Sequence, residues 1–426
     1  MTQEFSAPGT PTQAPQAQSA VPSDLPARTA GIPRGGLLIL AMAGFTAVTT
    51  ELLPSGLLPQ ISRDLGVAES AVGSLTAAYA AVIVITALPL SRLLGGRMPR
   101  KTLLIATVLA FALSNVLLAA RPRVGLAVAA RLLGGVAHGL LWSSMAPYVA
   151  RIVPAHSVGK AMAIVFSGNS IALAVGAPLG TMMGSVLSWR TSFLVLAGIA
   201  ALLALLAIRL LPPASDADRD TAPSLRAAMA LPGVIAVATA WPLLLLGHFA
   251  LFTYIAPFLL AAGLPDNATG ISLSVIGVAS LVGIWIAGLT ADARPRGSIL
   301  AGVALLLASF ALLPALGGTW TGSLALLTLW GITFGATGIY NQAAILRAGG
   351  EHKDAANGLA VVTIQLGIAV GAAYGALALN AVGALFVPLA AAVPLAVALV
   401  IIFASRHRGY PAGPREVRLP RCRFEG

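Results

Sequence analysis

The hydrophobic pattern of the chain is a succession of long apolar runs separated by short polar stretches. Each run has about 17–25 residues, the length that an α-helix needs to cross roughly 30 Å of hydrocarbon. Lipid cannot satisfy exposed backbone N–H and C=O groups, so each run is predicted to be helical. The sequence therefore predicts an all-α integral membrane protein with twelve transmembrane helices. The predicted spans are 36–58, 71–94, 102–120, 124–148, 160–186, 191–211, 234–260, 269–290, 298–316, 320–346, 355–380 and 384–405.

The runs fall into two sets of six, divided by the polar stretch "PPASDADRDTAPSLRAAMALP". An offset of 196 residues aligns Gly135 with Gly331 and Gly139 with Gly335, at equivalent places in the two sets. Chance matches among 45 glycines are the alternative. Paired halves are typical of a large transporter fold, so we expect two pseudo-symmetric six-helix bundles. The predicted plan is a disordered cytoplasmic segment over 1–35, an N-terminal bundle over 36–211, a cytoplasmic linker over 212–233, a C-terminal bundle over 234–405 and a basic cytoplasmic tail over 406–426.

Composition excludes an ordinary soluble protein. Charged residues make up 9% of the chain, against about 25% in soluble domains, and the mean hydropathy is +0.90. The net charge of +12 does not indicate nucleic-acid binding, because Lys and Arg lie in short clusters between apolar runs. The single cysteine, Cys422, excludes an intrachain disulfide and indicates no cysteine-based metal site. Residues 1–33 lack the apolar core of a secretory signal peptide.

Lys and Arg are distributed unevenly between the two sides that alternate along the predicted spans. If the N-terminus is cytoplasmic, the outer loops hold only Arg63, Arg121, Arg123 and Arg190 of the 26 Lys and Arg residues. Arg131 lies inside a span, and all the others fall on the cytoplasmic side. The positive-inside rule therefore predicts that both termini lie in the cytoplasm and that the chain spans the cell inner (plasma) membrane.

Two charged residues fall within the predicted membrane core. Glu51 lies about eight residues from the outer end of the first span, and Arg131 about eight residues from the outer end of the fourth, which places both roughly 12 Å deep. A charge there costs roughly 2.5–3.5 kcal/mol or more, so we expect the two to pair, directly or through water. A fixed structural ion pair and a carboxylate that gains and loses a proton are both open at this point.

Two histidines also lie within predicted helices and titrate near neutral pH in water. His138 follows Arg131 by two turns on the same helix face, and His248 lies in the seventh span within "GHFALFTYIAPFL". Each is a candidate for proton coupling, and the alternative for each is a packing or hydrogen-bonding role.

Few polar side chains interrupt the predicted helices, and together with tryptophans they are candidates to line a central cavity. Cavities that bind small organic molecules are mostly apolar, with a few placed polar groups. The candidates for the substrate cavity are Tyr79, Trp142, Asn169, Tyr254, Trp285, Tyr340, Asn341 and Gln365.

Three motifs indicate conformational roles. "GGRMPRKT" closes a short loop with Arg97, Arg100 and Lys101, and its counterpart "GLTADARPR" adds Asp292. A carboxylate near helix ends could latch one conformation to such cations, while a topology signal alone is the alternative. In the fifth span, "SGNSIALAVGAPLGTMMG" repeats glycine at multiples of four, which allows close helix packing, and its proline can bend the helix.

Several chemistries are not indicated by any motif. The chain has no G-x-x-x-x-G-K-[ST] loop and no HExxH, CxxC or G-x-S-x-G pattern. The sequence therefore predicts neither an enzyme nor an ATP-driven pump, and it indicates no cofactor and no metal.

These features together resemble the major facilitator superfamily over about 36–405, and more narrowly its twelve-helix drug/proton antiporter branch. That branch includes arabinose-type sugar efflux permeases, chloramphenicol exporters and purine ribonucleoside efflux pumps. The matching stretches are "TELLPSGLLPQISRDLGV", "RLLGGVAHG", "VGAPLGTMMG" followed by "WRTSF", and "FTYIAPFL".

The resemblance implies a major facilitator fold, a monomer, and roles for matched positions. Arg131 and Gly135 fit a helix-4 motif tied to proton transfer, and Gly176, Pro178 and Gly180 fit a helix-5 motif associated with antiport. The loop motif departs from the pattern at Gly96, where the family has Asp, which weakens the expected charge latch in the first half and leaves it to Asp292 in the second.

The sequence thus favours a secondary transporter that exports a small organic molecule in exchange for protons, with Glu51 and Arg131 as the coupling pair. Its expected partners are the substrate, protons and the lipid bilayer. A passive facilitator or importer with the same fold, and a membrane sensor that does not transport, are the alternatives. Nucleosides, sugars and amphipathic drugs all fit a cavity of this composition.

Overall fold

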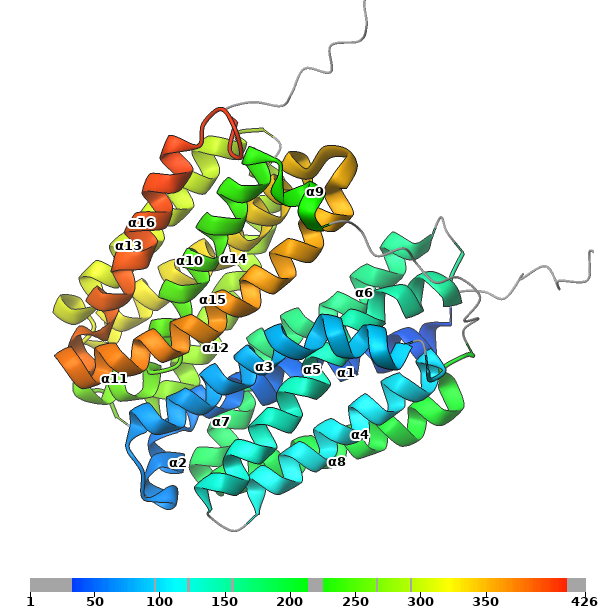
Figure 1. Ribbon diagram of the computed structural model, residues 1–426. Coiled ribbons are helices and arrows are strands. Elements are labelled where there is room, and N and C mark those ends of the chain that lie inside the picture. The colour runs from blue at the N-terminus through cyan, green and yellow to red at the C-terminus, as the bar shows by residue number, and fades with distance from the viewer. Residues whose placement is uncertain are drawn as a thin grey trace, which may run out of the picture. The chain divides into compact units, whose positions relative to one another are not determined.

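The computed structural model describes residues 33–95, 97–120, 123–154, 157–213, 225–265, 267–291 and 293–411 (Figure 1). Residues 1–32 of the predicted disordered segment and most of the predicted tail lie outside these ranges, as do Gly96 and Asp292 of the loop motifs. Helix α1 begins at Arg34, inside the segment 1–35 that the sequence predicts to be disordered.

Twelve spans in the described residues are long and apolar enough to cross a membrane. The predicted all-α class and number of transmembrane helices are therefore confirmed. In chain order the elements are α1 (Arg34–Gly56), α2 (Leu58–Leu65), α3 (Glu69–Gly95), α4 (Arg100–Ala119), α5 (Val124–Ile152), α6 (Val158–Ile171), the π-helix η2 (Ala172–Gly176), α7 (Ala177–Val186), α8 (Trp189–Leu210), α9 (Leu225–Met229), α10 (Pro232–Phe252), α11 (Ile255–Ala261), α12 (Ala268–Thr290), α13 (Pro295–Leu316), α14 (Trp320–Gly349), η3 (Gly350–His352), α15 (Lys353–Val382), η4 (Ala384–Phe386) and α16 (Val387–Ala404).

Two predicted spans are broken by local backbone chemistry. The run 234–260 is not one helix, because α10 ends at Phe252 and α11 begins at Ile255. Pro257 has no N–H, so the carbonyl of Thr253 lacks the partner that a continuous helix would give it. The run 160–186 contains the π-helix η2, which ends two residues before Pro178. Such wider turns often occur at functional sites.

The helices pack as two similar halves. In the first half α1 contacts α6 and α8, and α5 contacts α3 and α4. In the second half α10 contacts α15 and α16, and α14 contacts α12 and α13. Figure 1 shows the helices from α1 to α8 grouped together and those from α10 to α16 in a second group. Contacts of α3 with α15, and of η2 and α7 with α12, join the halves.

Glycines bring the helices of each half close together. A Cβ on Gly180 would lie 2.8 Å from a Leu53 methyl of α1, and one on Gly371 would lie 2.7 Å from the Leu246 carbonyl of α10. At Gly135, a Cβ would lie 2.6 Å from the Tyr79 carbonyl, so α5 passes against the backbone of α3. The predicted close approach at the helix-5 glycines is confirmed, and the same device recurs in the second half.

The outward surface of the described spans is apolar as well. Large side chains such as Ile85, Leu205, Leu377 and Phe403 are each more than half exposed. A soluble protein would not expose so many separate aliphatic and aromatic groups, whereas lipid tails accept them at no cost. Apolarity therefore marks both the packed and the lipid-facing sides of these helices.

Candidate functional site

Glu51 lies in a helix that lacks one of its backbone hydrogen bonds. Its side chain is 7% exposed, on α1, three residues before Pro54. Because Pro54 has no N–H, the carbonyl of Thr50 has no partner within its own helix. Arg131 of α5 fills this gap: its guanidinium donates to the Thr50 carbonyl at 2.8 Å and to the Glu51 carbonyl at 3.3 Å.

Arg131 is thus bound to the backbone of the helix that carries Glu51. The sequence predicts pairing of the two side chains, and the structure does bring them close enough for their charges to interact. The hydrogen bonds of the guanidinium, however, go to carbonyls and not to the carboxylate. Its carbon also lies 4.0 Å from the centre of the Tyr79 ring, a cation–π arrangement.

The Glu51 carboxylate instead faces His138. The distance from Oε2 to His138 Nε2 is 3.8 Å, beyond an ordinary hydrogen bond but within reach of a small rearrangement. The other ring nitrogen, Nδ1, lies 3.0 Å from the Tyr79 hydroxyl. A phenol that donates to Nδ1 leaves the Nε2 hydrogen directed at the carboxylate. Glu51, His138 and Tyr79 therefore lie in a row of proton-bearing groups, of which His138 and Tyr79 are joined by a hydrogen bond.

Glu51 also meets the second half of the molecule. The side chain of Gln365, on α15, approaches the carboxylate. The approach does not reach hydrogen-bond geometry, because Gln365 Nε2 and Glu51 Oε1 are both buried without a partner among the described residues. Two complementary polar atoms are thus poised across the junction of the halves.

Two polar residues of this site were missed by the sequence analysis. Asn115 is fully buried, and its amide donates to Thr50 Oγ1 at 3.1 Å. Ser114 donates to the Ala130 carbonyl at 2.7 Å and so joins α4 to α5. The adjacent Ser-Asn pair within an otherwise apolar run was the signal that could have identified them.

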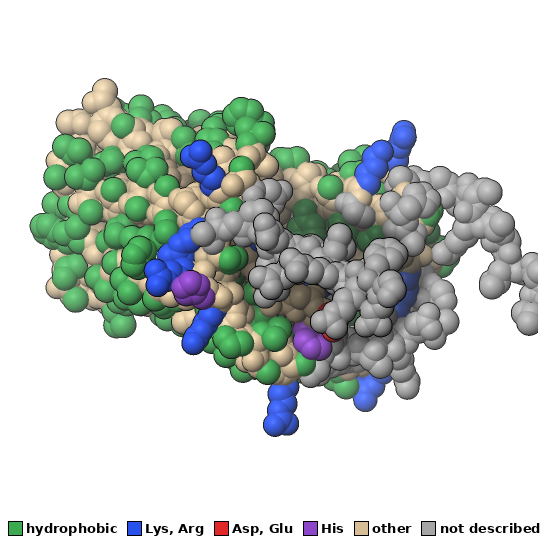
Figure 2. Space-filling model, turned by 90° about the horizontal axis from the view of Figure 1, so that it is seen from above, with side chains coloured by type: hydrophobic (Ala, Val, Ile, Leu, Met, Phe, Trp, Pro, Cys, Tyr) green, Lys and Arg blue, Asp and Glu red, His purple; other side chains and the backbone are tan. Residues whose placement is uncertain are grey.

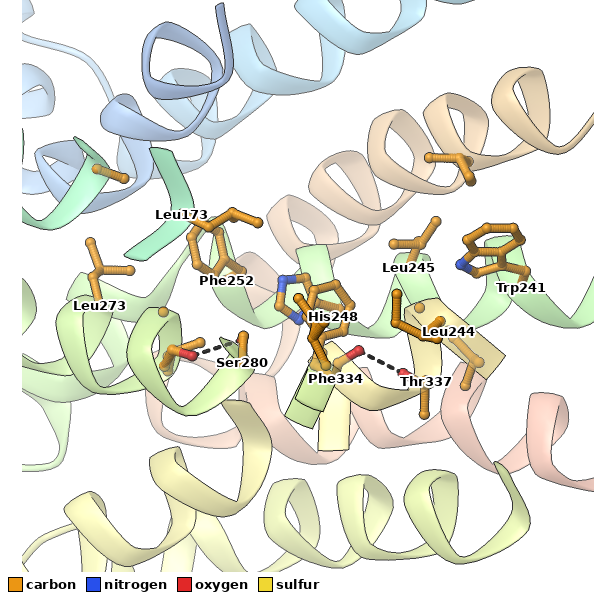
Figure 3. A pocket seen from close by; sticks show the side chains of 18 residues that line it. Leu173, Trp241, Leu244, Leu245, His248, Phe252, Leu273, Ser280, Phe334 and Thr337 are labelled. Carbon is orange, nitrogen blue, oxygen red and sulfur yellow. Dashed lines mark hydrogen bonds between the residues drawn. The ribbon is translucent and has the colours of Figure 1, made fainter. Parts of the chain in front are cut away.

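A second site is a cavity of about 220 Å³, lined mainly by α10, α12 and α14 of the second half (Figure 3). Trp241, Leu244, Leu245, His248 and Phe252 form one stripe of α10 along it. Leu173 and Ala177 contribute the wall that comes from the first half. Of the residues predicted for coupling or substrate binding, only His248 lines this cavity.

His248 is held by aromatic groups. The Trp330 indole N–H donates to its Nδ1 at 2.9 Å, so in the neutral ring the hydrogen sits on Nε2. Its ring stacks on Phe334, with centres 3.5 Å apart and planes 7° from parallel. The offset of 196 residues aligns Phe334 with His138, and His248 directly follows the position equivalent to Glu51. The buried titratable groups of the two halves therefore occupy nearly equivalent places.

The other predicted cavity residues are dispersed. Tyr79 and Gln365 belong to the Glu51 site, and Trp142 stacks on Phe166 with its ring 6.2 Å from His138. Asn169 is partly buried on α6.

The predicted cavity residues of the second half do not line the cavity either, and three of them make hydrogen bonds away from it. The Tyr254 hydroxyl donates to the Ala372 carbonyl at 3.2 Å. Asn341 accepts from the Tyr410 hydroxyl at 2.7 Å, and the Tyr340 and Thr290 hydroxyls are 2.7 Å apart. Trp285 is 67% exposed on the outside of α12, so the structure does not place it with the others.

The loop cations cap helix ends. Lys101 Nζ donates to the Ile208 carbonyl at 2.8 Å near the end of α8. In the second half Arg296 donates to the carbonyls of Phe403 at 2.8 Å and Tyr410 at 3.0 Å, at and beyond the end of α16. Cations suit these ends, where carbonyls lack helical partners. Arg97 is exposed, and Arg100 begins α4.

A polar cluster joins α2 to α8 at the end of the bundle that the sequence predicts to be outer. Asp64 accepts hydrogen bonds from the Trp189 indole, at 2.7 Å, and from the Arg190 guanidinium. Burial alone would raise the pKa of Asp64, but these bonds and the charge of Arg190 outweigh it and hold the pKa below its ordinary value.

The fold and its two buried sites define a class: a twelve-helix membrane transporter built from two similar halves. Residues 40–372 match the family profile described as Major Facilitator Superfamily, and the chain belongs to that family. It is a membrane transporter and not an enzyme.

The chain is similar to named relatives along most of its length. A chloramphenicol efflux pump of Mycobacterium tuberculosis (strain CDC 1551 / Oshkosh) is 35% identical over 351 residues, 80% of this chain and 85% of the relative. Transcription regulatory protein OpdE of Pseudomonas aeruginosa (strain PAO1) is 33% identical over 384 residues, 89% of this chain and 95% of the relative.

Solved structures share the fold. A bacterial homologue of the human lysosomal transporter Spinster, in an inward-facing and occupied conformation, matches with a TM-score of 0.71 at 13% sequence identity. The match covers 88% of this chain and 98% of that one.

Proposed function

We propose that this protein exports a small organic molecule from the cell in exchange for protons, and that Glu51 is the group that carries the proton. The observation that supports this most is the placement of its buried carboxylate. One oxygen lies 3.8 Å from His138 of the same half, and the other has no partner beside Gln365 of the opposite half. On gaining a proton, this carboxyl would change from an acceptor only to a group that can also donate a hydrogen bond to His138 or Gln365.

The coupling acts through α15 rather than through a swinging arginine. Arg131 is occupied by the backbone carbonyls of α1, so protonation of Glu51 does not need to release it. Gln365 is adjacent to Ile364, which lines the cavity in the second half. A carboxylate accepts from the Gln365 amide, whereas a carboxylic acid can also donate to it. The proton and the substrate thus act on consecutive residues of one helix.

The energies required are within reach of a proton gradient. Moving a two-state equilibrium from 1:99 to 99:1 takes about 5.5 kcal/mol of differential binding. One charge crossing 100 mV supplies about 2.3 kcal/mol. The proton concentration difference and substrate binding supply the rest.

The distribution of charge supports cytoplasmic termini, and the efflux pump among the similar proteins supports outward export. Figure 2 shows Lys and Arg side chains on the face at the top of Figure 1, where α9 and the end of α16 lie. Contacts of α7 with α12 and of α2 with α11 join the halves in segments that the charge rule predicts to be outer, and α3 contacts α15 as well.

The test is transport in proteoliposomes with an imposed pH gradient, with chloramphenicol as the first substrate because of the 35% identical relative. We expect Glu51→Gln to lose the dependence of flux on the gradient while still exchanging substrate without one. Glu69→Gln, the same change at the partly buried start of α3, is the matched control and keeps the dependence. Gradient-driven flux in Glu51→Gln equal to that of the unmodified protein would remove Glu51 from the mechanism.

A membrane sensor is the second candidate, because a relative that matches most of this chain is named a transcription regulatory protein. Substrate binding with no flux under any gradient, together with altered transcription on deletion, would favour it. A passive facilitator would instead show counterflow without any movement of protons.

A further inference from the structure

The cavity of the second half is free of charge. It is bounded by α10, α12 and α14, and Leu173 of the π-helix η2 forms part of its wall (Figure 3). Among the described residues that line it, none is Asp, Glu, Lys or Arg. A cation or an anion would lose its hydration there with no countercharge to replace it, which makes binding of either costly.

The polar groups of the cavity include both acceptors and donors. Ser280 and Thr337 use their hydroxyl hydrogens on the carbonyls of Ile276, at 2.8 Å, and Phe334, at 2.9 Å, so only their oxygens remain as acceptors (Figure 3). Because the Trp330 indole donates to Nδ1 of His248, the neutral ring carries its hydrogen on Nε2, and no described residue accepts it. Trp241, two turns earlier on α10, adds its indole N–H donor to the lining.

The cavity wall around His248 is aromatic and flat. Phe334 stacks on the ring at 3.5 Å, and Phe252 lies at 5.2 Å with its plane 21° from that of the histidine. Offset and edge contacts with such rings favour planar apolar groups. Sugars present many hydroxyls on a non-planar frame and would leave most of them without partners here.

We propose that this cavity binds an uncharged, flat and mostly apolar molecule whose carbonyl, nitro or ether oxygen accepts a hydrogen bond from Nε2 of His248. The inference rests on the proposed transport function, of which this molecule is the substrate. It selects among the classes that the sequence left open: aromatic drug-like molecules bind, while free sugars and organic cations do not.

The wall of the cavity includes residues of both halves. Leu173 reaches it from η2, and a Cβ on Gly277 of α12 would lie 2.7 Å from Ala174 in the same π-helix. A molecule in the cavity therefore contacts the one segment where the fifth span departs from α-helical geometry. Substrate binding and the packing of η2 against α12 are linked by this contact.

The first experiment blocks the cavity with a matched pair of glycine variants. No atom lies within 4 Å of a Cβ built on Gly338, which lines the cavity, or on Gly288, which is exposed on the outside of α12. Binding of radiolabelled chloramphenicol to the purified protein is measured by equilibrium dialysis without a pH gradient. Gly338→Leu should abolish binding, and Gly288→Leu should leave the affinity unchanged. Equal binding by the two variants overturns the proposal.

The second experiment removes the donor. His248→Phe keeps a planar ring, and the double variant His248→Phe/Trp330→Phe also removes the indole that would lose its acceptor. We expect chloramphenicol to bind about 3- to 10-fold more weakly to both, the range for one neutral hydrogen bond. Thermal unfolding in detergent checks that both variants fold. Unchanged affinity in the double variant contradicts the assigned donor.

The third experiment tests the substrate class and separates this inference from the proposed function. The probes are chloramphenicol, L-arabinose and benzyltrimethylammonium, an aromatic cation. Only chloramphenicol should bind, and tighter binding of the sugar or the cation overturns the proposal. The dialysis measures binding without a pH gradient. If the unmodified protein binds chloramphenicol but shows no proton-driven flux in vesicles, only the proposed transport mechanism is refuted. Gradient-driven flux of chloramphenicol with no effect of Gly338→Leu would refute only the cavity.

Discussion

At the scale of single residues, the role of Arg131 follows from a missing hydrogen on a neighbouring helix. Pro54 leaves the carbonyl of the buried Thr50 without a donor in its own helix, and the guanidinium supplies one. The sequence predicts that Arg131 lies near Glu51, and the structure brings their charges close enough to interact. Pro54 already marks the Thr50 carbonyl as lacking its helical donor, but the sequence does not tell which side chain of another helix reaches it.

If Arg131 serves the Thr50 carbonyl, then a backbone N–H at position 54 should recover stability that is lost when Arg131 is replaced. Arg131→Met should destabilise the protein in detergent by about 1.5–3 kcal/mol, the range for a buried hydrogen bond to a charged group. Adding Pro54→Ala supplies an N–H for the Thr50 carbonyl and should recover part of that loss. Denaturant unfolding of the two single variants and the double variant forms the cycle. If the changes in unfolding free energy of the two single variants simply add up in the double variant, Arg131 does not stabilise this carbonyl.

Asp64 provides a pH-dependent prediction at the same scale. Its folded pKa lies below the ordinary value, so its contribution to stability is present above the unfolded pKa of about 3.9 and is lost as the pH falls through the folded pKa. Asp64→Asn should therefore reduce the unfolding temperature at neutral pH and remove part of its decline below about pH 4. Since the side chain is 39% exposed, the effect is small and diminishes at high salt. If the unfolding temperatures of the two proteins changed with pH in the same way across this range, the assigned role of Asp64 would be contradicted.

At the scale of helices, the apolar runs predicted the spans well because lipid permits nothing else at that length. They did not predict which way a side chain faces. Both the packed and the lipid-facing sides of these helices are apolar, so no periodic contrast separates Trp285, which is exposed, from His248, which lines the cavity. The breaks near Pro178 and Pro257 were visible as prolines, but the π-helix at the first was not.

Close helix contacts give a matched pair of glycine variants. Gly135→Ala places a methyl against the Tyr79 carbonyl of α3 and should lower the unfolding temperature in detergent. Gly198→Ala on α8 meets nothing within 4 Å and should leave it unchanged or raise it, because alanine favours the helix by about 1 kcal/mol. Equal shifts in the two variants would show that α5 and α3 do not depend on this contact.

At the scale of the whole molecule, the two halves repeat one plan with different chemistry. Each has a proline-associated break after its first helix, a glycine-rich fifth helix packed on the first, and a cation that caps the sixth. The first half then places a carboxylate beside a histidine, and the second places a histidine against phenylalanine. The offset of 196 residues revealed this symmetry. The different side-chain contacts at the two equivalent sites became visible only in the three-dimensional structure.

Movement between the halves predicts that a covalent link at their junction stops transport. A Cβ on Gly270 of α12 would lie 3.7 Å from Met182 Cβ of α7, within the range of disulfides. In a Cys422→Ser background, Gly270→Cys/Met182→Cys should form a disulfide on oxidation and lose flux in proteoliposomes, and reduction should restore it. The two single-cysteine variants are controls. Full flux in the crosslinked protein would contradict alternation at this junction.

The central claim is that Glu51 exchanges a proton as the substrate binds and leaves. It is tested most directly by recording proton release with a pH indicator when chloramphenicol is added to weakly buffered, purified protein. We expect release from the unmodified protein and from Glu69→Gln, and none from Glu51→Gln at a concentration where that variant still binds. The same release from Glu51→Gln as from the unmodified protein would contradict the account.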